Sequence, residues 1–323
     1  MTRQIVTTDI GGTHARFALA TIEGGRVARL SEPVTLKTAE HASFQTAWEE
    51  FGRRSGGALP PELAISFAGP VGGELLKLTN NPWVIRPALI GEKLGVEHYT
   101  IVNDFGAVGH AVAALDGSAY AHLCGPDASL PEQGIISIVG PGTGLGVASL
   151  LRQASSYQVI ETEGGHVDFA PLDALEDGIL RELRRSFRRV SVERLVSGRG
   201  LVNIYEALGA IENRPLAIRD DKQLWAAAMD GSDSLAAAAL DRLCLILGAV
   251  AGDLALAQGA TGVVIGGGLG LRLAEHLPRS GFRDRFIAKG RFERRMDEMP
   301  VKLITHPQPG LFGAAAAFAR AHR

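Results

Sequence analysis

The amino-acid sequence predicts an α/β protein with two lobes, and three observations support this prediction. At 323 residues, the chain is longer than one compact core usually serves. Short apolar runs rich in β-branched residues alternate with segments of helical periodicity, which is typical of an α/β layer. A unit of strand, glycine turn and strand occurs near residues 5–19 and again near 134–151, which suggests two related lobes.

The first third of the chain begins with a β-meander and continues as alternating strands and helices. Its predicted elements are a strand at 5–10, a hairpin formed by 16–22 and residues from 26 onward, a helix at 42–54, a strand at 63–68, a strand at 100–103 and a helix at 105–115. Glycines follow the first strand directly, so a tight turn is expected there.

The rest of the chain returns to the same theme and then becomes mainly helical. Its predicted elements are a strand at 134–139, a glycine turn at 140–146, a strand at 147–151, helices between 171 and 259 with a long one from about 233 to 258, a strand at 262–265 and a helix at 311–320. Gly248 and Gly252 inside the long helix remove bulk from one face, which indicates close helix packing.

Charge and composition favour a small-molecule partner. The formal net charge is -2, so no global positive field attracts nucleic acid or an anionic membrane surface. No signal-like start is present and no run of ~20 uninterrupted apolar residues occurs, so we expect a soluble, cytoplasmic protein without a membrane partner. The oligomeric state is left open, a homodimer included.

Two cysteines, Cys124 and Cys244, are the only ones in the chain. Neither belongs to a CxxC or Cys/His cluster, so we expect both cysteines to be small, buried hydrophobic side chains. HExxH spacing is also missing, so we expect no tightly bound metal.

Three glycine clusters follow predicted strands and suit phosphate or a flat ring, because bare backbone can approach a ligand closely. They are Asp9-Ile-Gly11-Gly12-Thr13, Gly140-Pro-Gly142-Thr143-Gly144-Leu-Gly146 and Gly266-Gly267-Gly268. The first has an ordinary hairpin turn as its alternative, and the third has a strand-to-helix turn. Neither a Walker A motif nor a Rossmann GxGxxG motif occurs in the first turn.

Asn103 and Asp104 end a predicted strand and precede a helix, where open α/β sheets present ligands. The Asp104 carboxylate is suited to act as a base there. The alternative, that Asp104 only caps the helix, stays open because spacing does not separate the two roles.

A polar segment, Glu161-x-Glu163-Gly-Gly-His166-x-Asp168, places four ionisable side chains around two flexible glycines. This pattern suits directional hydrogen bonds to a polyol. A second charged group, Arg181, Arg184, Arg185 and Arg188, falls on one helical face, and the favoured interpretation is a solvated basic face.

These motifs together resemble the bacterial, proteobacterial-type glucokinase family of the hexokinase and actin-like ATPase superfamily. The resemblance rests on Asp9 to Arg16, Leu78-Thr-Asn-Asn-Pro-Trp83, Asn103-Asp-Phe105, Gly140 to Gly146, Glu163 to Pro171 and Glu193-Arg-Leu-Val-Ser-Gly198. It spans almost the whole chain. One departure is Arg199, where the family pattern leads us to expect proline.

The resemblance implies roles for individual residues. It implies that ATP is held by Asp9, Gly11, Gly12, Thr13, Gly140, Gly142, Thr143 and Gly144, with Gly266, Gly267 and Gly268 facing adenosine, and that Mg²⁺ arrives with ATP near Asp9. Glucose hydroxyls would be held by Asn103, Asp104, Glu163, His166 and Glu193. Asp104 would also be the base that takes the proton of the 6-hydroxyl.

The implied architecture is a two-lobed actin-like ATPase, or ribonuclease H-like, fold with the active site in the cleft between the lobes. Residues 1–114 and the final helix, 305–323, would form a small α/β lobe, and residues 115–304 a large α+β lobe. The implied reaction is ATP-dependent phosphorylation of glucose at its 6-hydroxyl. Two alternatives are a kinase for fructose or mannose and a sugar-binding regulator without catalysis.

Overall fold

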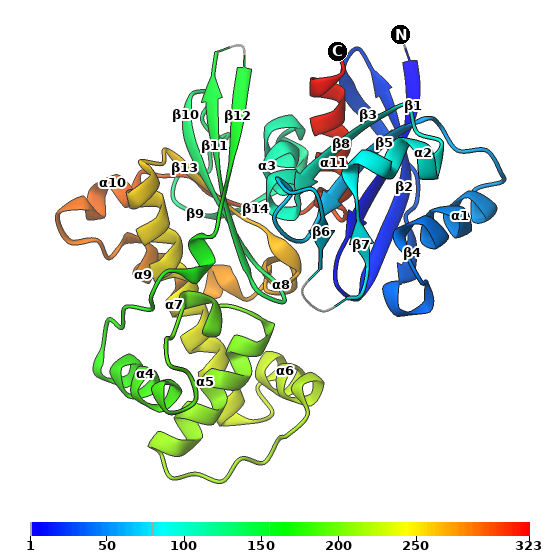
Figure 1. The fold of residues 1–323 in the computed structure, drawn as a ribbon. Helices are drawn as coiled ribbons and strands as arrows, with labels where there is room; N and C mark the ends of the chain where they lie inside the picture. Colours follow the sequence, from blue (N-terminus) through cyan, green and yellow to red (C-terminus); the bar gives the residue numbers. More distant parts are fainter. Residues whose placement is uncertain (1, 79–80, 155) are drawn as a thin grey trace. The chain divides into compact units, whose positions relative to one another are not determined.

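The computed structural model describes residues 2–78, 81–154 and 156–323. These residues separate into two compact units, each with its own sheet. Unit 1 contains residues 2–116, 159–161 and 306–323, and unit 2 contains residues 117–158 and 162–305, apart from the gaps just given. The α/β class predicted from the sequence is confirmed (Figure 1).

Unit 1 is built on a six-stranded sheet with the spatial order β3-β2-β1-β5-β8 and β4 paired to β2. Its strands are β1 (Thr2–Ile10), β2 (His14–Glu23), β3 (Arg26–Leu30), β4 (Val34–Lys37), β5 (Glu62–Phe67) and β8 (His98–Asn103). Strands β1, β5 and β8 run parallel, with Ile10, Phe67 and Asn103 at the same level of the sheet. The carboxyl ends of these three strands therefore lie at one edge.

Helices cover both faces of this sheet (Figure 1). They are α1 (Phe44–Arg54) and the short α2 (Ile90–Leu94) on one side, and α3 (Asp104–Ala114) and α11 (Pro309–Ala321) on the other; η1 (Thr38–Glu40), η2 (Pro87–Leu89), β6 (Leu76–Lys77) and β7 (Val84–Ile85) lie in connections. Alternation along β1 explains the two cores, because Val6 packs with Trp48 of α1 whereas Ile5 packs with Phe318 of α11.

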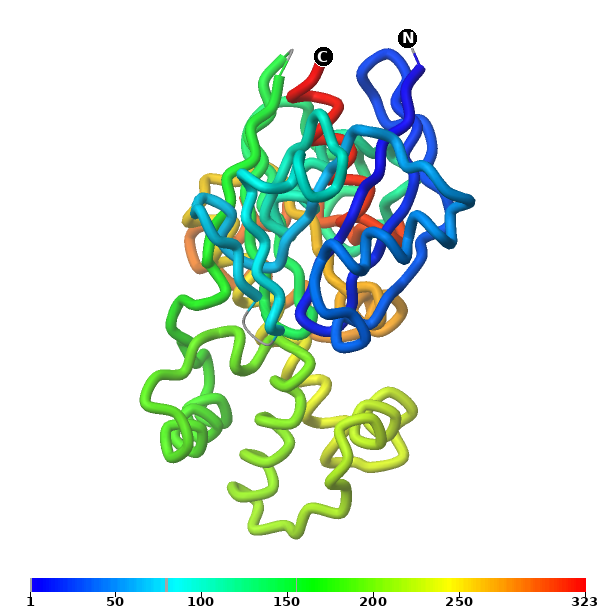
Figure 2. The backbone as a smooth tube through the Cα atoms, turned by 45° about the vertical axis from the view of Figure 1, so that its right-hand side comes forward, coloured from blue at the N-terminus to red at the C-terminus, as the bar shows by residue number. Residues whose placement is uncertain are grey.

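The two ends of the chain meet in unit 1. Arg3 donates to the backbone carbonyl of His322 and, at 3.0 Å, to Oε1 of Glu62. The tube in Figure 2 shows the first strand and the last helix reaching the same end of the unit. A further hydrogen bond joins the final helix to the first sheet: the hydroxyl of Thr7 in β1 donates to the carbonyl of Leu311 in α11 at 2.8 Å. These contacts fix the final helix to the sheet.

Unit 2 contains a second six-stranded sheet, in the order β12-β11-β10-β13-β14-β9. Its strands are β9 (Tyr120–Cys124), β10 (Gly134–Pro141), β11 (Leu145–Gln153), β12 (Ser156–Thr162), β13 (Gly262–Ile265) and β14 (Val301–Ile304). Strands β10 and β11 form an antiparallel hairpin, and β10, β13 and β14 run parallel. This arrangement repeats the β2-β1-β5 pattern of unit 1, as the repeated sequence units suggested.

Seven α-helices of unit 2 are described, and the longest is its core. They are α4 (Ala174–Ser186), α5 (Gly198–Ile211), α6 (Asp221–Asp230), α7 (Ser234–Gln258), α8 (Gly267–Arg272), α9 (Phe282–Ile287) and α10 (Glu293–Asp297), with η3 (Gly117–Ala119), η4 (Gly164–His166), η5 (Val192–Arg194), η6 (Leu277–Arg279) and η7 (Gly290–Phe292) between them. Helix α7 has the length and apolar composition of a membrane span, but most of it is buried among its neighbours.

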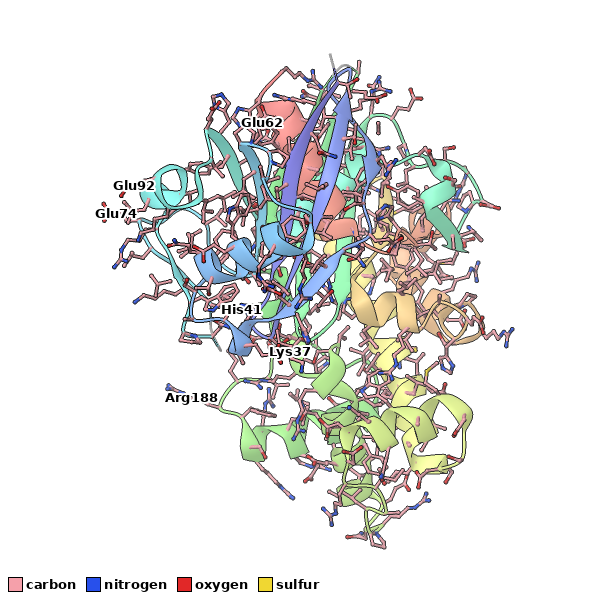
Figure 3. The ribbon with its side chains drawn as sticks, turned by 90° about the vertical axis from the view of Figure 1, so that its right-hand side faces the viewer. Lys37, His41, Glu62, Glu74, Glu92 and Arg188 are labelled. Carbon is pink, nitrogen blue, oxygen red and sulfur yellow. The ribbon has the colours of Figure 1, made fainter. Side chains whose placement is uncertain are left out.

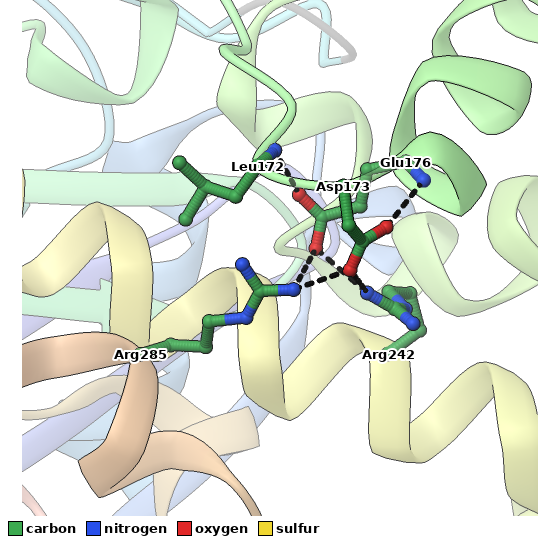
Figure 4. Close-up of polar contacts among 5 residues, drawn as sticks. All are labelled: Leu172, Asp173, Glu176, Arg242 and Arg285. Atoms are coloured by element: carbon green, nitrogen blue, oxygen red, sulfur yellow. Dashed lines mark hydrogen bonds and ion pairs between the residues drawn. The ribbon is translucent and has the colours of Figure 1, made fainter. Parts of the chain in front are cut away.

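Small residues let α7 and α9 approach closely, as the sequence predicted. A Cβ at Gly248 or Gly252 would lie under 3.0 Å from backbone carbonyl oxygens of Phe282 or Phe286 in α9. Asp173, Glu176, Arg242 and Arg285 then tie α4, α7 and α9 together as an ion cluster, which we call the charge quartet (Figure 4).

The structure corrects the extent of the turn predicted at 140–146, and in the third glycine cluster it has the strand-to-helix turn that was that cluster's alternative. Strand β10 continues through Gly140 and Pro141, so the second turn is limited to residues 142–144. In the third cluster, Gly266 is the N-cap of α8, and Gly267 and Gly268 form its first turn. Hydrogen bonding across the sheet extends the strand beyond what local composition suggested.

Both cysteines are buried, which confirms their predicted hydrophobic role. Burial raises the pKa of each thiol to about 12. Two residues of the motif at 78–83, Thr79 and Asn80, lie outside the described residues.

Candidate active site

The first glycine turn is a hairpin between β1 and β2, braced from outside. Gly11 N–H donates to the His14 carbonyl at 2.9 Å. The carbonyl of Gly12 accepts from Thr38 Oγ1 at 2.8 Å and from Asn81 Nδ2 at 3.0 Å. The backbone thus adopts the hairpin alternative, which the Gly11 N–H closes, and the turn keeps the Gly12 and Thr13 N–H groups and the Thr13 hydroxyl that a phosphate would need. Figure 3 shows Lys37 and His41 at this end of the sheet and Glu62 at the other.

Asp9 lies at the carboxyl end of β1, directly before this turn. Its Oδ1 accepts from Ser66 Oγ at 2.9 Å, and its Oδ2 pairs with Arg16 Nη1 at 3.2 Å. A Cβ on Gly310 would come within 3.1–3.2 Å of the carboxylate, so glycine leaves room for it. The carboxylate is about one quarter exposed, at 24%, and is therefore both oriented and open to a ligand.

Asn103 and Asp104 occupy the end of β8, two strands from Asp9 and roughly 10 Å away by the spacing of strands. Asn103 is the N-cap of α3: its Oδ1 accepts from Phe105 N–H at 2.9 Å and Gly106 N–H at 3.2 Å. Its Nδ2 donates to the Gly69 carbonyl at 3.1 Å. Asp104 is the first residue of the helix, and its Oδ1 accepts from Phe105 N–H at 2.9 Å.

The second glycine turn, in unit 2, is braced by Glu193 and by the start of α5. Glu193 Oε2 accepts from Leu145 N–H at 2.9 Å. A Cβ on Gly144 would lie under 3.0 Å from the same oxygen, so only glycine lets the carboxylate sit there. On the other side, Gly198 N–H donates to the Gly142 carbonyl at 2.8 Å.

The third glycine cluster packs against the second turn. Gly267 has a φ of +72°, and a Cβ there would meet the Pro141 carbonyl. Gly266 N–H donates to the Val139 carbonyl at 2.9 Å. At Gly268 nothing lies within 4 Å of the Cβ position, so its backbone faces open space that a flat ring can use.

The segment with Glu163 and His166 also lies against the second turn. Its 3-10 helix η4 lies so close to β11 that a Cβ on Gly165 would clash with the Leu145 carbonyl. Glu163 Oε2 lies 3.9 Å from His166 Nε2, and both side chains are mostly exposed. Arg189 anchors the far end of the segment: it pairs with Asp168 at 2.6 Å and donates to the His166 carbonyl at 2.6 Å.

The predicted site residues therefore form two groups, one in each unit. In unit 1 they are Asp9, Gly11, Gly12, Thr13, Asn103 and Asp104, all at the carboxyl ends of parallel strands or in the turn that follows. In unit 2 they are Gly140, Gly142, Thr143, Gly144, Glu163, His166, Glu193, Gly266, Gly267 and Gly268, gathered around the β10–β11 turn.

Sequence reasoning missed the residues that hold these turns in place. Ser66 is fully buried and orients Asp9, while Thr38 and Asn81 hold the first turn. Asn81 lies in the motif at residues 78–83, so the sequence offered a sign of its importance. Ser66 is an isolated serine in an apolar strand, and only its polarity could have pointed to a role. Arg199, the departure from the family pattern, lies in the first turn of α5 and pairs with Asp221 at 3.2 Å.

A cavity of about 490 Å³ lies elsewhere in unit 2, between α4, η5 and α5. It contains none of the predicted site residues. Across the described residues, no group of three His, Cys, Asp or Glu side chains is placed to hold a metal ion by itself.

Comparisons with known proteins give a consistent result. Residues 6–321 match the family model for glucokinase. The chain is 66% identical over 316 residues to a glucokinase from Zymomonas mobilis, covering 98% of both chains. It is 38% identical to a glucokinase from Paramagnetospirillum magneticum, over 98% of this chain and 97% of the relative.

Solved structures agree with the sequence comparison. A crystal structure of glucokinase from an Antarctic psychrotroph has a TM-score of 0.86 at 33% identity, covering 98% of this chain and 99% of the other. A ROK family glucokinase from Streptomyces griseus, solved with glucose and AMPPNP, has a TM-score of 0.63 at 18% identity, covering 99% of this chain and 100% of the other, and shows a shared fold.

Proposed function

The chain belongs to the glucokinase family, and we propose that the two groups of residues described above serve one reaction, the transfer of the γ-phosphate of ATP to the 6-hydroxyl of glucose. The observation that carries this proposal is the 66% identity with a glucokinase along 98% of both chains. The protein is an enzyme with the actin-like ATPase fold, which confirms the resemblance seen in the sequence.

ATP would be bound by the three glycine clusters. Gly11 and Gly142 close the two turns through their own N–H groups. The N–H groups of Gly12 and Thr13 suit one part of the triphosphate, and those of Thr143 and Gly144 suit another, because N–H groups in a glycine-rich turn can donate hydrogen bonds to phosphate oxygens at close range. The open backbone at Gly268 supports an adenosine site beside the second turn.

Glucose would be bound by Asn103, Asp104, Glu163, His166 and Glu193. Carboxylates and an imidazole offer directional hydrogen bonds to hydroxyl groups. The exposure of Glu163 and His166, together with their separation of 3.9 Å, leaves both available to a ligand. Glu193 has one carboxylate oxygen committed to Leu145, so its other oxygen would take the sugar.

Asp104 would act as the general base. As the new bond forms between the sugar oxygen and the γ-phosphorus, the hydroxyl proton passes to the Asp104 carboxylate, and the bond from the γ-phosphorus to the bridging oxygen breaks to release ADP. Asp104 lies at the carboxyl end of a parallel strand and at the start of α3, a position that favours a carboxylate. Asn103 supplies the helix cap, which weakens the alternative that Asp104 has only a capping role.

Magnesium suits the residues present. Asp9 offers oxygen ligands of the kind Mg²⁺ prefers, beside a turn suited to phosphate, and one or two carboxylates with phosphates and water commonly complete such a site. Bound Mg²⁺ would neutralise charge on the triphosphate. Ser66 and Arg16 orient the Asp9 carboxylate for that role.

The deciding experiment is a coupled assay of the purified protein with a panel of sugars and phosphoryl donors, with and without Mg²⁺. We expect glucose 6-phosphate from glucose and ATP, and no activity in excess chelator. Faster turnover of fructose or mannose would instead favour the other hexose kinases. We further propose a cytoplasmic enzyme, because ATP is its phosphoryl donor, and sedimentation of the same sample would decide whether it is a homodimer.

A further inference from the structure

We infer that Glu161 is a positioning residue for the proposed base, because it holds the backbone of Asn103 immediately before Asp104. The inference rests on the proposed function, in which Asp104 takes the proton of the sugar hydroxyl. Glu161 precedes the proposed sugar-binding carboxylate Glu163 by two residues. The sequence pattern grouped it with side chains suited to a polyol, and the resemblance gave it no role.

The contact lies within unit 1, between residues 159–161 and the edge of the first sheet. Residues 159–161 of β12 cluster with unit 1, and Glu161 Oε1 accepts from Asn103 N–H at 3.1 Å. Strand β8 is the last strand of its sheet, so N–H groups on its outer side have no neighbouring strand as a partner. A carboxylate in this place makes a charge-assisted hydrogen bond next to the positive end of α3.

Two glycines in α3 make room for this approach. A Cβ at Gly106 would lie under 3.0 Å from Glu161 Oε1, and a Cβ at Gly109 would lie under 3.0 Å from Val159 Cγ1. Glycine weakens a helix, so two glycines three residues apart, facing alternate residues of one strand segment, indicate that the segment lies directly against the helix backbone. The close contact therefore depends on particular residues in both segments: Gly106 and Gly109 in the helix, and Val159 and Glu161 in the strand.

The effect of Glu161 on the base follows from how Asn103 is held. Its N–H is bound by Glu161, its Oδ1 by the first turn of α3 and its Nδ2 by the Gly69 carbonyl. These contacts fix the position from which the Asp104 side chain projects. Misplacing a catalytic group by about 1 Å can cost about 10²-fold in rate, so Glu161 should act on turnover with little effect on ATP.

The test compares four single variants and one double variant of the protein. Glu161→Ala should lower kcat by about 10-fold to 10²-fold, while KM for ATP and the thermal midpoint stay close to the parent. Glu161→Gln keeps an oxygen acceptor for Asn103 N–H and should recover most of the turnover. The matched control is Val159→Ala, which loosens the same strand from the same helix but leaves the Asn103 contact, and its kcat should stay close to the parent.

The fourth variant, Gly106→Ala, displaces the carboxylate from the helix side. It should lower kcat in the parent but have no further effect in the Glu161→Ala background, because no carboxylate is left to displace. The amide resonance of Asn103 in a ¹⁵N spectrum reports the contact independently of activity and should move in Glu161→Ala and not in Val159→Ala.

Turnover unchanged in Glu161→Ala, or equal losses in Glu161→Ala and Val159→Ala, would overturn the inference. An unmoved Asn103 resonance would overturn the contact itself. A parent enzyme that does not phosphorylate glucose would overturn the proposed function instead, and the Asn103 resonance would still decide whether the contact exists.

Discussion

At the start of α3, the structure assigns the helix cap to Asn103, whereas the sequence alone left open whether Asp104 is a helix cap or a base. Asn103 has the extended backbone of an N-cap and bonds two amides of the first turn, whereas Asp104 is already helical. The cap is therefore supplied without Asp104, and a change at Asp104 should leave the helix in place. This makes the catalytic role testable without a large effect on folding.

Asp104→Asn should cut kcat by about 10²- to 10⁴-fold, because it removes the basic carboxylate while keeping shape and hydrogen bonding. The thermal midpoint and glucose affinity should stay near those of the parent. Coupled assays, thermal unfolding and titration calorimetry of one sample measure all three. Turnover within a few-fold of the parent would remove Asp104 from the mechanism.

Glu193 is the residue for which the structure adds most to the sequence interpretation. As a sugar ligand alone, its loss should affect glucose more than ATP. Its bond to Leu145 N–H shows that it also supports the second glycine turn, so the two effects need separate variants.

We expect Glu193→Gln to weaken glucose binding while keeping KM for ATP, because the amide oxygen still accepts from Leu145. Glu193→Ala should weaken both, since a lost partner for a hydroxyl or amide costs about 1–3 kcal/mol at a buried site. Calorimetry with glucose and steady-state kinetics with ATP distinguish the two variants. Unchanged glucose affinity in both would refute the assignment of Glu193 to the sugar.

At the scale of elements, the charge quartet fixes three helices of unit 2 to one another (Figure 4). Arg242 Nη1 lies 2.6 Å from Asp173 Oδ2 and 2.9 Å from Glu176 Oε1, and Arg285 contacts both carboxylates. Backbone N–H groups bind the remaining oxygens. Burial acts to raise the pKa of Asp173, but its hydrogen bonds from the Glu176 backbone and Arg242 outweigh this and lower the pKa.

Arg242→Met should destabilise unit 2, because it leaves the carboxylate of Glu176 with Arg285 as its one cation among the described residues, and Glu176 is only 1% exposed. Breaking a buried pair costs about 3–5 kcal/mol, and the remaining Arg285 should keep the loss near the lower end. Urea unfolding followed by helical circular dichroism measures it. Arg294→Met, which breaks the exposed pair with Glu298, is the control and should change little; equal losses in both variants would contradict this account.

At the scale of the whole chain, α3 and α11 bring sequence-distant segments into contact within unit 1, and His110 of α3 is partly buried there. Burial, and then the nearby Arg320, lower its pKa from 6.5 to about 4. The folded protein therefore holds this histidine neutral at pH values where the unfolded chain protonates it. Stability from this group is present above about pH 6.5 and is lost as the pH falls towards 4.

The expected loss between pH 6.5 and 4 is about 3 kcal/mol, from roughly 1.4 kcal/mol for each pKa unit. His110→Gln removes the titration, so its unfolding free energy should fall less over the same range. Urea unfolding of parent and variant at several pH values gives the difference directly. Parallel pH profiles would show that His110 does not titrate as described.

Local sequence was enough to determine the motifs and several of the elements, but strands β4, β9, β12 and β14 were not predicted from it. The strand before Gly11, the hairpin at residues 23–26, the long helix ending near Gln258 and the strand before Gly266 all depend on short-range periodicity and on turn residues, so each was predicted close to its observed bounds. The family was also evident, because its motifs are short, ordered along the chain and dense in glycine.

Only the tertiary structure decided which residues support those motifs. Ser66 reaches Asp9 across 57 residues of sequence, Glu193 reaches Leu145 across 48, and Glu161 reaches Asn103 across 58. Likewise, Gly106 and Gly144 are the places in the fold where a carboxylate comes against the backbone, a role that the sequence pattern did not indicate for either. Such contacts carry no local pattern, because a hydrogen bond between distant segments depends on how strands pair and helices pack, and not on the spacing of neighbouring residues.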